Sequence, residues 1–289
     1  MEKLIREKIS SLLSDEEEVL SVEQLGGMTN QNYLVKTTFK PYIVKFFGKG
    51  TEKLINRQDE KYNLELLKDL NLDVKNYLFD IESGIKVNEY IESAVTLDST
   101  SIKTKFEKIA PILQTIHASG KELRGEFAPF EEIKKYESLI EGPIPYANYE
   151  AVRKDVFSLE KRLVDLGIDT KSCHIDLVPE NFIESPQGRM YLIDWEYSSM
   201  NDPMWDLAAL FLESDFTNQE EEDFLTYYES DKTPVSREKI RIYKILQDTI
   251  WSLWTVYKEA QGADFGDYGV NRYQRAVDGL TYYGGLDEE

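Results

Sequence analysis

The stretch CHIDLVPENFIESPQGRMYLIDWEYSSMNDPMWD, residues 173–206, decides the fold of this chain. Within it, two short apolar runs at residues 181–184 and 190–193 flank the turn sequence S-P-Q-G at 185–188. Two such runs on either side of a proline- and glycine-containing turn predict a β-hairpin. Pairing of the runs would bring together the polar side chains that precede the first run and follow the second.

Three of these polar side chains have the chemistry of a phosphotransferase site. Asp176 precedes the first run, Asn181 opens it and Asp194 follows the second run. Carboxylate and amide oxygens are ligands that Mg²⁺ prefers, and one carboxylate is then left to accept a proton. Asp and Asn are also common in turns, so D-x-x-x-x-N alone is a weak signal. The full string H-x-D-x-x-x-x-N, a hairpin and then apolar-apolar-D favours catalysis.

These residues resemble the catalytic and metal-binding loops of the protein-kinase-like fold. The phrase LIDWEYSSMNDPMWDLA most resembles the choline/ethanolamine kinase family, in particular its bacterial choline kinases. The resemblance covers nearly the whole chain and is strongest at residues 24–33, 172–182 and 190–213. It implies an α+β, two-lobed protein-kinase-like fold, with a small N-terminal lobe built on an antiparallel sheet and a larger, mainly helical C-terminal lobe. The expected divisions are an ATP-binding lobe at 1–87, a hinge at 88–92, and a lobe with the catalytic and substrate sites at 93–289.

Composition excludes several other classes of protein. The chain has 289 residues and a net charge of −20, which argues against nucleic-acid binding because phosphate backbones need a basic surface. No apolar run approaches the roughly 20 residues of a membrane span, so no membrane insertion is expected. The start, Met1-Glu2-Lys3, reads as a polar amphipathic helix and not as a signal peptide. The one cysteine, Cys173, fits a reducing cytoplasm.

Hydrophobic periodicity predicts the remaining elements. Strands are expected at 19–25, 32–37, 42–47, 77–79 and 85–87. Helices are expected at 2–13, 51–70, 101–118, 130–140, 149–166, 204–212, 237–261 and 268–283. His117, at the end of one of these helices, is expected to be structural because a histidine in a helix's last turn is ordinary.

The turn GGMTN, residues 26–30, joins the first two strands. Backbone amides in such a turn could approach phosphate oxygens, although Gly-Gly is equally typical of a plain hairpin. The turn departs from the G-x-G-x-x-G loop of protein kinases. It resembles the G-G-x-T-N loop of choline kinases, which implies that Gly27, Thr29 and Asn30 contact ATP.

Lys45 stands within the apolar strand YIVKFF, where an unpaired charge is costly to bury. An edge lysine that points to solvent is the alternative. The pattern resembles the kinase lysine that holds the α- and β-phosphates, whose partner is a glutamate on the following helix. Glu60 is the expected partner, with Asp59 as its competitor. The resemblance also implies that Glu89 and Tyr90, in the hinge, meet the adenine.

A second group of residues is aromatic. Trp251 and Trp254 lie one helical turn apart and so share a helix face. Such pairs usually belong to a core, but a quaternary ammonium is recognised by aromatic faces and nearby carboxylates. Choline kinases use tryptophans on a late helix together with a glutamate, and Glu213 stands at that glutamate's position. Tyr197 and Tyr268 are the candidates that complete the substrate pocket.

The chain is therefore expected to be a choline kinase that uses ATP and Mg²⁺ to phosphorylate the hydroxyl of choline. The resemblance implies that Asp176 orients this hydroxyl and accepts its proton, while Asn181 and Asp194 hold the metal. His174 and Asp206 are expected to brace the catalytic loop. The alternatives are an ethanolamine or aminoglycoside kinase of the same fold and a non-catalytic nucleotide-binding scaffold. A switched activation segment is not expected, because Trp195-Glu196 follow Asp194 where protein kinases have Phe-Gly.

Overall fold

The structure is a computed structural model that describes residues 2–26, 30–48 and 50–286. The chain divides into two compact units. Unit 1 contains residues Met1–Leu97 and Glu180–Glu196, and unit 2 contains Asp98–Pro179 and Tyr197–Glu289. The five-stranded sheet lies in unit 1, and unit 2 is mainly helical, as the sequence predicts.

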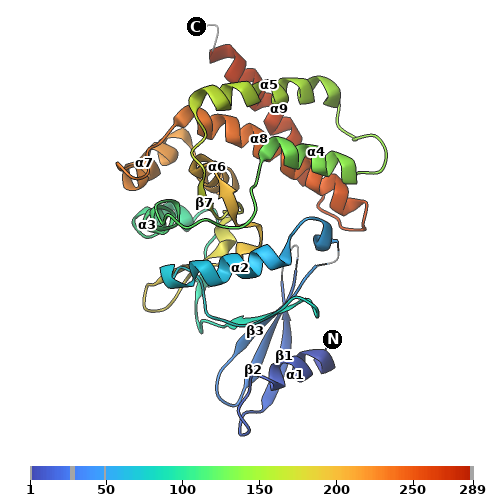
Figure 1. The fold of residues 1–289 in the computed structure, drawn as a ribbon, viewed down its shortest axis with the longest axis vertical. Coiled ribbons are helices and arrows are strands. Elements are labelled where there is room, and N and C mark those ends of the chain that lie inside the picture. Colours follow the sequence, from blue (N-terminus) through green and yellow to red (C-terminus); the bar gives the residue numbers. More distant parts are fainter. Residues whose placement is uncertain (1, 27–29, 49, 287–289) are drawn as a thin grey trace. The chain divides into compact units, whose positions relative to one another are not determined.

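Unit 1 is built on a five-stranded antiparallel sheet (Figure 1). Its strands are β1 (Val19–Leu25), β2 (Gln31–Thr37), β3 (Tyr42–Phe46), β4 (Asn76–Asp80) and β5 (Ile85–Glu89), in the order β1-β2-β3-β5-β4. The register places Lys45 of β3 opposite Asn32 of β2 and Lys86 of β5. The five predicted strands are confirmed to within two residues at each end.

One face of this sheet forms the core of the unit. Helix α1 (Glu2–Ser10) buries Ile5 and Ile9 against Val35, Val44 and Val87 of the sheet. The apolar residues of α1 recur at helical spacing, so one stripe of the helix can cover the strands. Figure 1 shows α1 lying beside β1 and β2.

The predicted helix at 51–70 is divided into three parts. A 3₁₀ turn at Thr51–Lys53 precedes α2 (Arg57–Leu67), and a second 3₁₀ turn follows at Lys68–Leu70. The division occurs because Asn56 has extended backbone angles and accepts hydrogen bonds from the amides of Gln58 and Asp59. An asparagine in this role starts a new helix.

The predicted hairpin is confirmed. Strands β8 (Phe182–Glu184) and β9 (Met190–Leu192) pair antiparallel, and the short strand β6 (Val95–Thr96) pairs with β8. This pairing attaches residues 180–196 to unit 1, whereas the sequence analysis assigned residues 93–289 to the helical part as one piece. The sequence-based division differs because it followed chain order, whereas β8 pairs with β6, a strand about 90 residues earlier in the chain. The expected hinge residues, 88–92, also lie within unit 1.

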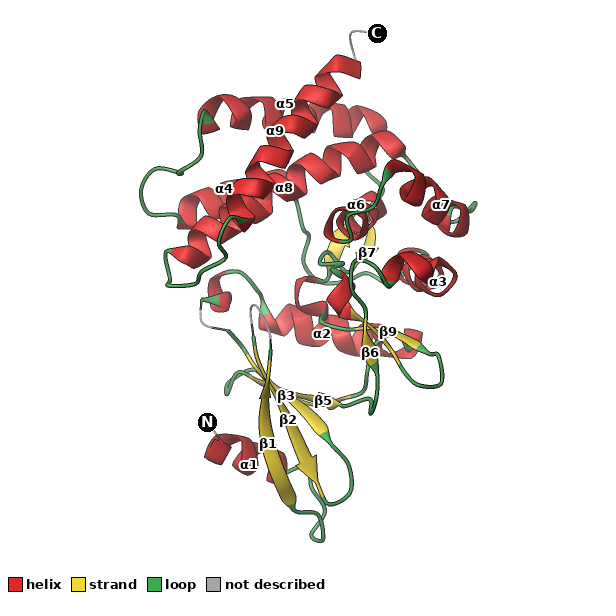
Figure 2. Ribbon diagram, turned by 180° about the vertical axis from the view of Figure 1, so that it is seen from behind, coloured by secondary structure: helices red, strands yellow, loops and turns green. Residues whose placement is uncertain are grey.

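Unit 2 is organised around its longest helix. Its helices are α3 (Phe106–His117), α4 (Pro129–Leu139), α5 (Tyr149–Leu166), α6 (Pro203–Glu213), α7 (Asn218–Tyr228), α8 (Arg237–Glu259) and α9 (Tyr268–Leu286). Helix α8 packs against α9, α6 and α4, and Figure 2 shows α8 and α9 side by side. Strands β7 (Lys171–Cys173) and β10 (Ser199–Asn201) form a small antiparallel pair. The predicted helix at 101–118 begins later, at Phe106, after a 3₁₀ turn at Ile102–Thr104.

Among the described helices, none has both the length and the apolar character that a bilayer span requires.

Candidate active site

The hairpin of unit 1 brings Asn181 and Asp194 to the same end of β8 and β9. Phe182 pairs with Leu192, and the amide of Ile193 donates to the carbonyl of Asn181 over 2.8 Å. Asp194 is the next residue and has a φ of 67°, in the left-handed region that non-glycine residues seldom adopt. This backbone turn ends β9 and sets the direction of the carboxylate, as strained residues at functional sites often do.

Lys45 is paired with this carboxylate. Its Nζ lies 2.6 Å from Oδ1 of Asp194, and the lysine is buried. Burial opposes the charge of Lys45, but Asp194 and then Glu196 more than offset this effect, so the pKa of Lys45 is raised. The lysine therefore stays protonated, which is the form that can bind phosphate oxygens.

The expected pairing of Lys45 with Glu60 is not the one in the structure. Both Glu60 oxygens are taken by other cations: one pairs with Nζ of Lys86, and the other lies 2.7 Å from Arg57. Arg57 is three residues earlier on the same helix, and Lys86 lies opposite Lys45 in the sheet. These two cations are nearer competitors for Glu60, and the sequence analysis considered neither of them. Glu60 still acts on Lys45 through its charge.

Glu196 is a further acid of this region that the sequence analysis missed. Both of its oxygens accept from Nδ2 of Asn30, at 3.1 and 3.0 Å, and one also lies 2.8 Å from Arg57. Oδ1 of Asn30 accepts from the amide of Gly48 over 3.1 Å. The buried Glu196 carboxylate lies two residues after Asp194. Through Asn30 and Arg57 it connects this part of the chain to the start of β2, the end of β3 and the start of α2. Its place in the string DWE was the available signal.

The other expected ATP contacts lie at two ends of the sheet. Asn30 immediately precedes β2, and Gly27 and Thr29 lie outside the described residues. Glu89 ends β5, where its amide donates to the carbonyl of Lys75 over 2.8 Å, and Tyr90 follows it. The contacts of these residues with ATP therefore remain predictions.

In unit 2, Asp206 holds the backbone before Asp176. Its two oxygens accept from the amides of His174 and Ile175, both over 2.8 Å. Ile175 has a φ of 78°, so the chain turns sharply immediately before Asp176. The indole of Trp205 also donates to the carbonyl of Ile175 over 3.0 Å. The fully buried Asp206 thus determines the course of the loop from which the Asp176 side chain projects.

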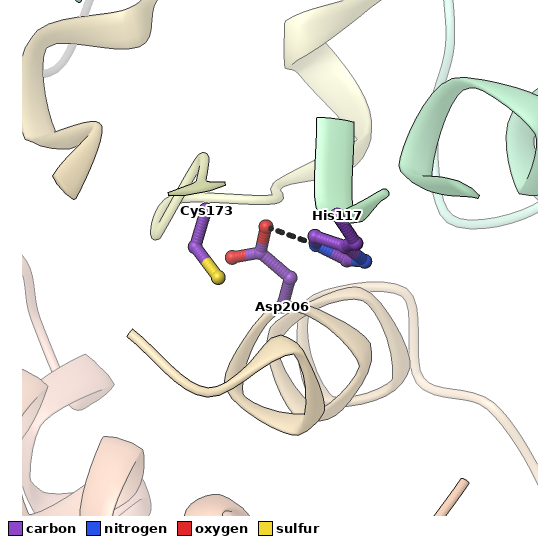
Figure 3. A group of neighbouring side chains, drawn as sticks. All are labelled: His117, Cys173 and Asp206. Atoms are coloured by element: carbon purple, nitrogen blue, oxygen red, sulfur yellow. Dashed lines mark hydrogen bonds and ion pairs between the residues drawn. The ribbon is translucent and has the colours of Figure 1, made fainter. Parts of the chain in front are cut away.

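His117, Cys173 and Asp206 form a buried cluster with ligand-type atoms within 4.8 Å of one another (Figure 3). Nε2 of His117 lies 3.0 Å from Asp206, and its Nδ1 lies 2.8 Å from the Tyr228 hydroxyl. The Asp206 oxygens already accept backbone amides, and burial raises the pKa of the Cys173 thiol well above its usual range. A neutral thiol and an occupied carboxylate are poor metal ligands. The cluster is therefore a structural support of the loop.

Aromatic side chains gather on α8 and beside Asp176. Trp251 and Trp254 are buried, and the ring of Tyr197 meets Trp251 edge-on with centroids 5.7 Å apart. Trp254 packs on Phe265 at 4.9 Å, and its buried Nε1 has no acceptor among the described residues. Burial raises the pKa of Tyr268 to about 12, an effect that Arg272 opposes and that Glu213 and Asp176 reinforce. Tyr268 and Asp176 therefore lie within electrostatic range of each other.

Tyr136, on α4, is a second aromatic residue of this region that the sequence analysis missed. Burial raises its pKa, Glu132 and Asp176 reinforce the effect, and a hydrogen bond with Tyr197 opposes it. Its hydroxyl therefore connects α4 to Tyr197, one of the expected pocket residues. It lies 40 residues before Asp176 in the sequence, with no motif between them to indicate the contact.

Glu213, expected to face a substrate cation, is paired with a cation of the protein. It forms an ion pair with Arg272 of α9, and Arg272 lies 3.0 Å from Asp248 of α8. Arg275 also pairs with Asp248, at 2.6 Å. Burial opposes the charge of Arg272, but Glu213 and its other neighbours raise its pKa. The sequence analysis missed Arg272, which no motif contains.

These features define the class of the protein. A lysine in the third strand, an aspartate in an H-x-D loop and a second aspartate that ends a β-hairpin recur in protein-kinase-like phosphotransferases. A model of the choline/ethanolamine kinase family matches residues 22–241. The chain belongs to the choline/ethanolamine kinase family.

Individual relatives are similar over most of the chain. The crystal structure of choline kinase LicA from Streptococcus pneumoniae is 87% identical, with a TM-score of 0.95 over 98% of this chain and 99% of that one. A crystal structure of LicA in complex with AMP is 88% identical, with a TM-score of 0.92 over 97% of this chain and 98% of that one. Protein LicA of Haemophilus influenzae is 31% identical over 265 residues, which cover 87% of this chain and 77% of that protein.

Proposed function

We propose that this protein is a choline kinase, which transfers the γ-phosphoryl group of ATP to the hydroxyl of choline and releases ADP and phosphocholine. The observation that carries the proposal is the pair of indoles on one face of α8, Trp251 and Trp254, in the unit that also holds Asp176. A quaternary ammonium has no N–H to donate, so aromatic faces are its natural partners. The similarity to a choline kinase at 87% identity supports the same assignment.

Asp176 is proposed as the group that orients the choline hydroxyl and accepts its proton. The turn at Ile175 and the two amides held by Asp206 give the loop a defined course, so the carboxylate is positioned before substrate binds. Positioning and charge neutralisation account for most of the rate enhancement in phosphoryl transfer. The lone pair of the hydroxyl oxygen forms the new P–O bond as the bond to ADP breaks, and Asp176 takes the hydroxyl proton.

Asn181 and Asp194 are proposed to hold Mg²⁺. Their carboxamide and carboxylate oxygens suit a hard cation, and the hairpin brings both residues to one end of β8 and β9. When bound, the ion would neutralise the charge of the phosphates. Lys45 shares the Asp194 carboxylate and would steady the same phosphates.

The nucleotide itself is proposed to lie against unit 1. Its phosphates would meet the turn that contains Gly27, Thr29 and Asn30, and its adenine would meet the backbone of Glu89 and Tyr90. Glu60 would contribute to nucleotide binding indirectly. It pairs with Arg57 and Lys86, and its negative charge favours the protonated form of Lys45. We also propose a cytoplasmic location, since ATP and a reduced buried thiol, that of Cys173, both fit that compartment.

The test is an ATP-consumption assay with choline, ethanolamine, thiamine and kanamycin side by side, with the phosphorylated product identified by mass. Choline should be the best acceptor. Asp176→Ala should lose more than about a hundredfold in turnover while keeping the wild-type melting temperature, since general acid–base groups contribute about 10²–10⁴. A wild-type protein that prefers ethanolamine or kanamycin would contradict the choline assignment. Near-wild-type turnover in a folded Asp176→Ala protein would remove Asp176 from the mechanism.

A further inference from the structure

Arg272 is the most deeply buried cation among the residues that surround the proposed choline pocket. Only 3% of it is exposed, and it forms ion pairs with Glu213 at the end of α6 and Asp248 of α8. Its guanidinium lies over the ring of Tyr268, 4.8 Å from the centroid. The residue thus contacts both an acid and an aromatic ring that the pocket is expected to use.

This placement changes what Glu213 can offer to a substrate. A bare carboxylate would attract any ammonium, and it would favour one that carries N–H groups, because charge-assisted hydrogen bonds are the strong ones. With its charge balanced by Arg272, Glu213 offers much less to such a cation. The pairing does not weaken the attraction of the aromatic faces for a cation. The pocket should therefore prefer a cation that needs no hydrogen bond over one that does.

We propose that Arg272 determines specificity in the acceptor pocket by pairing with Glu213, so that a methylated ammonium is preferred over a primary one. The inference rests on the proposed function, since it assumes that Glu213 and the α8 indoles meet the substrate's ammonium group. Arg272 acts through Glu213 and is therefore a positioning residue.

A purely structural role for Arg272 is the competing explanation, because it joins α6, α8 and α9. One observation favours specificity: Arg272 pairs with Glu213 as well as with Asp248. Arg275 pairs with the same Asp248 but acts on Glu213 only through its charge, and it is much more exposed than Arg272. The chain therefore contains a second arginine that joins α8 and α9 without an ion pair to Glu213.

The experiment measures kcat/KM for choline and for ethanolamine, together with melting temperature, in Arg272→Met, Arg272→Lys and the matched control Arg275→Met. In Arg272→Met the choline-to-ethanolamine ratio should fall about tenfold, the value of one charge-assisted hydrogen bond released to a primary ammonium. Arg272→Lys should keep most of the wild-type ratio because it keeps the charge. Arg275→Met should change the ratio much less than Arg272→Met, whatever it does to stability, because Arg275 acts on Glu213 only through its charge.

Arg272→Met leaves Asp248 with one cation, so a second variant guards against misfolding. Arg272→Met/Asp248→Asn again gives the network equal numbers of cations and acids while leaving Glu213 in place, and its ratio should also fall. A folded Arg272→Met or double variant whose ratio stays within twofold of wild type overturns the proposal. A wild-type protein that does not phosphorylate choline refutes the proposed function instead, so the two failures are distinguishable. Titration of tryptophan fluorescence with choline and ethanolamine gives the ratio of their dissociation constants without turnover, and Arg272→Met should shift this ratio in the same direction.

Discussion

Removal of the Glu196 carboxylate should destabilise unit 1 and weaken ATP binding. Glu196 is 7% exposed and accepts hydrogen bonds from Asn30 and Arg57, which are both buried. Glu196→Ala removes one of the two carboxylates paired with Arg57 and leaves Nδ2 of Asn30 without its acceptor. Breaking a buried ion pair by deleting one partner costs about 3–5 kcal/mol. At about 2–4 °C per kcal/mol for a chain of this size, the melting temperature should fall by roughly 6–20 °C.

The same change should act on ATP and not on choline. Asn30 borders the turn proposed to meet the phosphates, and Glu196 is one of the acids that raise the pKa of Lys45. Glu196→Ala should therefore raise the KM for ATP several-fold, with the KM for choline unchanged. Glu196→Gln, which keeps one acceptor oxygen but no charge, should lie between wild type and Glu196→Ala in both measurements.

Lys239→Met provides the control, because it breaks a buried ion pair of unit 2, in which Lys239 lies 2.6 Å from Asp202. It should lower the melting temperature and leave the KM for ATP near the wild-type value. The role proposed for Glu196 is refuted if Glu196→Ala melts within about 2 °C of wild type and binds ATP normally. It is also refuted if both variants raise the KM for ATP equally, since the effect would then follow stability alone.

Three further predictions concern single residues. Lys45→Met should raise the KM for ATP or lower kcat without changing choline affinity; a loss confined to choline would place Lys45 at another site. Trp254→Ala should weaken choline by a few-fold to about thirtyfold, given a cation–π contact of about 0.5–2 kcal/mol, and weaken ethanolamine less. If Trp254 is only core, the melting temperature drops and the choline-to-ethanolamine ratio does not move. Burial raises the pKa of Asp73, which lies between the 3₁₀ turn at Lys68–Leu70 and β4, to about 7. Its contribution to the free energy of unfolding is therefore fully present below pH 4 and is lost as the pH rises through 7. Asp73→Asn should therefore melt higher than wild type at pH 8 in EDTA and equally at pH 4; an equal melting temperature at both pH values would contradict the raised pKa.

Local pattern was enough to predict the hairpin and the sheet. The runs at 181–184 and 190–193 and the turn between them contain the whole signal within about a dozen residues, and the structure pairs them as expected. Helix α5 has the predicted bounds, Tyr149–Leu166, because its apolar periodicity is uninterrupted. The helix expected at 51–70 was wrong in its continuity, because the capping hydrogen bonds of Asn56 override a periodicity that continues past it.

The charge partners could not be predicted in the same way. Arg57 and Glu196 are 139 residues apart, and Arg272 and Glu213 are 59 apart. A charged residue has many possible partners in the sequence, and only the fold decides which of them is nearest. Lys45 illustrates the point: the family pattern assigned this lysine to Glu60, whose carboxylate oxygens instead pair with Arg57 and Lys86.

The two buried charge networks perform related tasks in their separate units. In unit 1, Glu196 and Arg57 connect β2, β3 and α2 to a position two residues after the proposed metal ligand Asp194. In unit 2, Arg272 connects α6, α8 and α9 around the proposed pocket acid, Glu213. A buried pair costs desolvation and often adds little net stability, so we propose that each network positions the residues of the site beside it. We therefore propose that Arg57 and Arg272, which lie outside the motifs, position the groups that the motifs contain. A mutational survey limited to the motifs would include neither arginine.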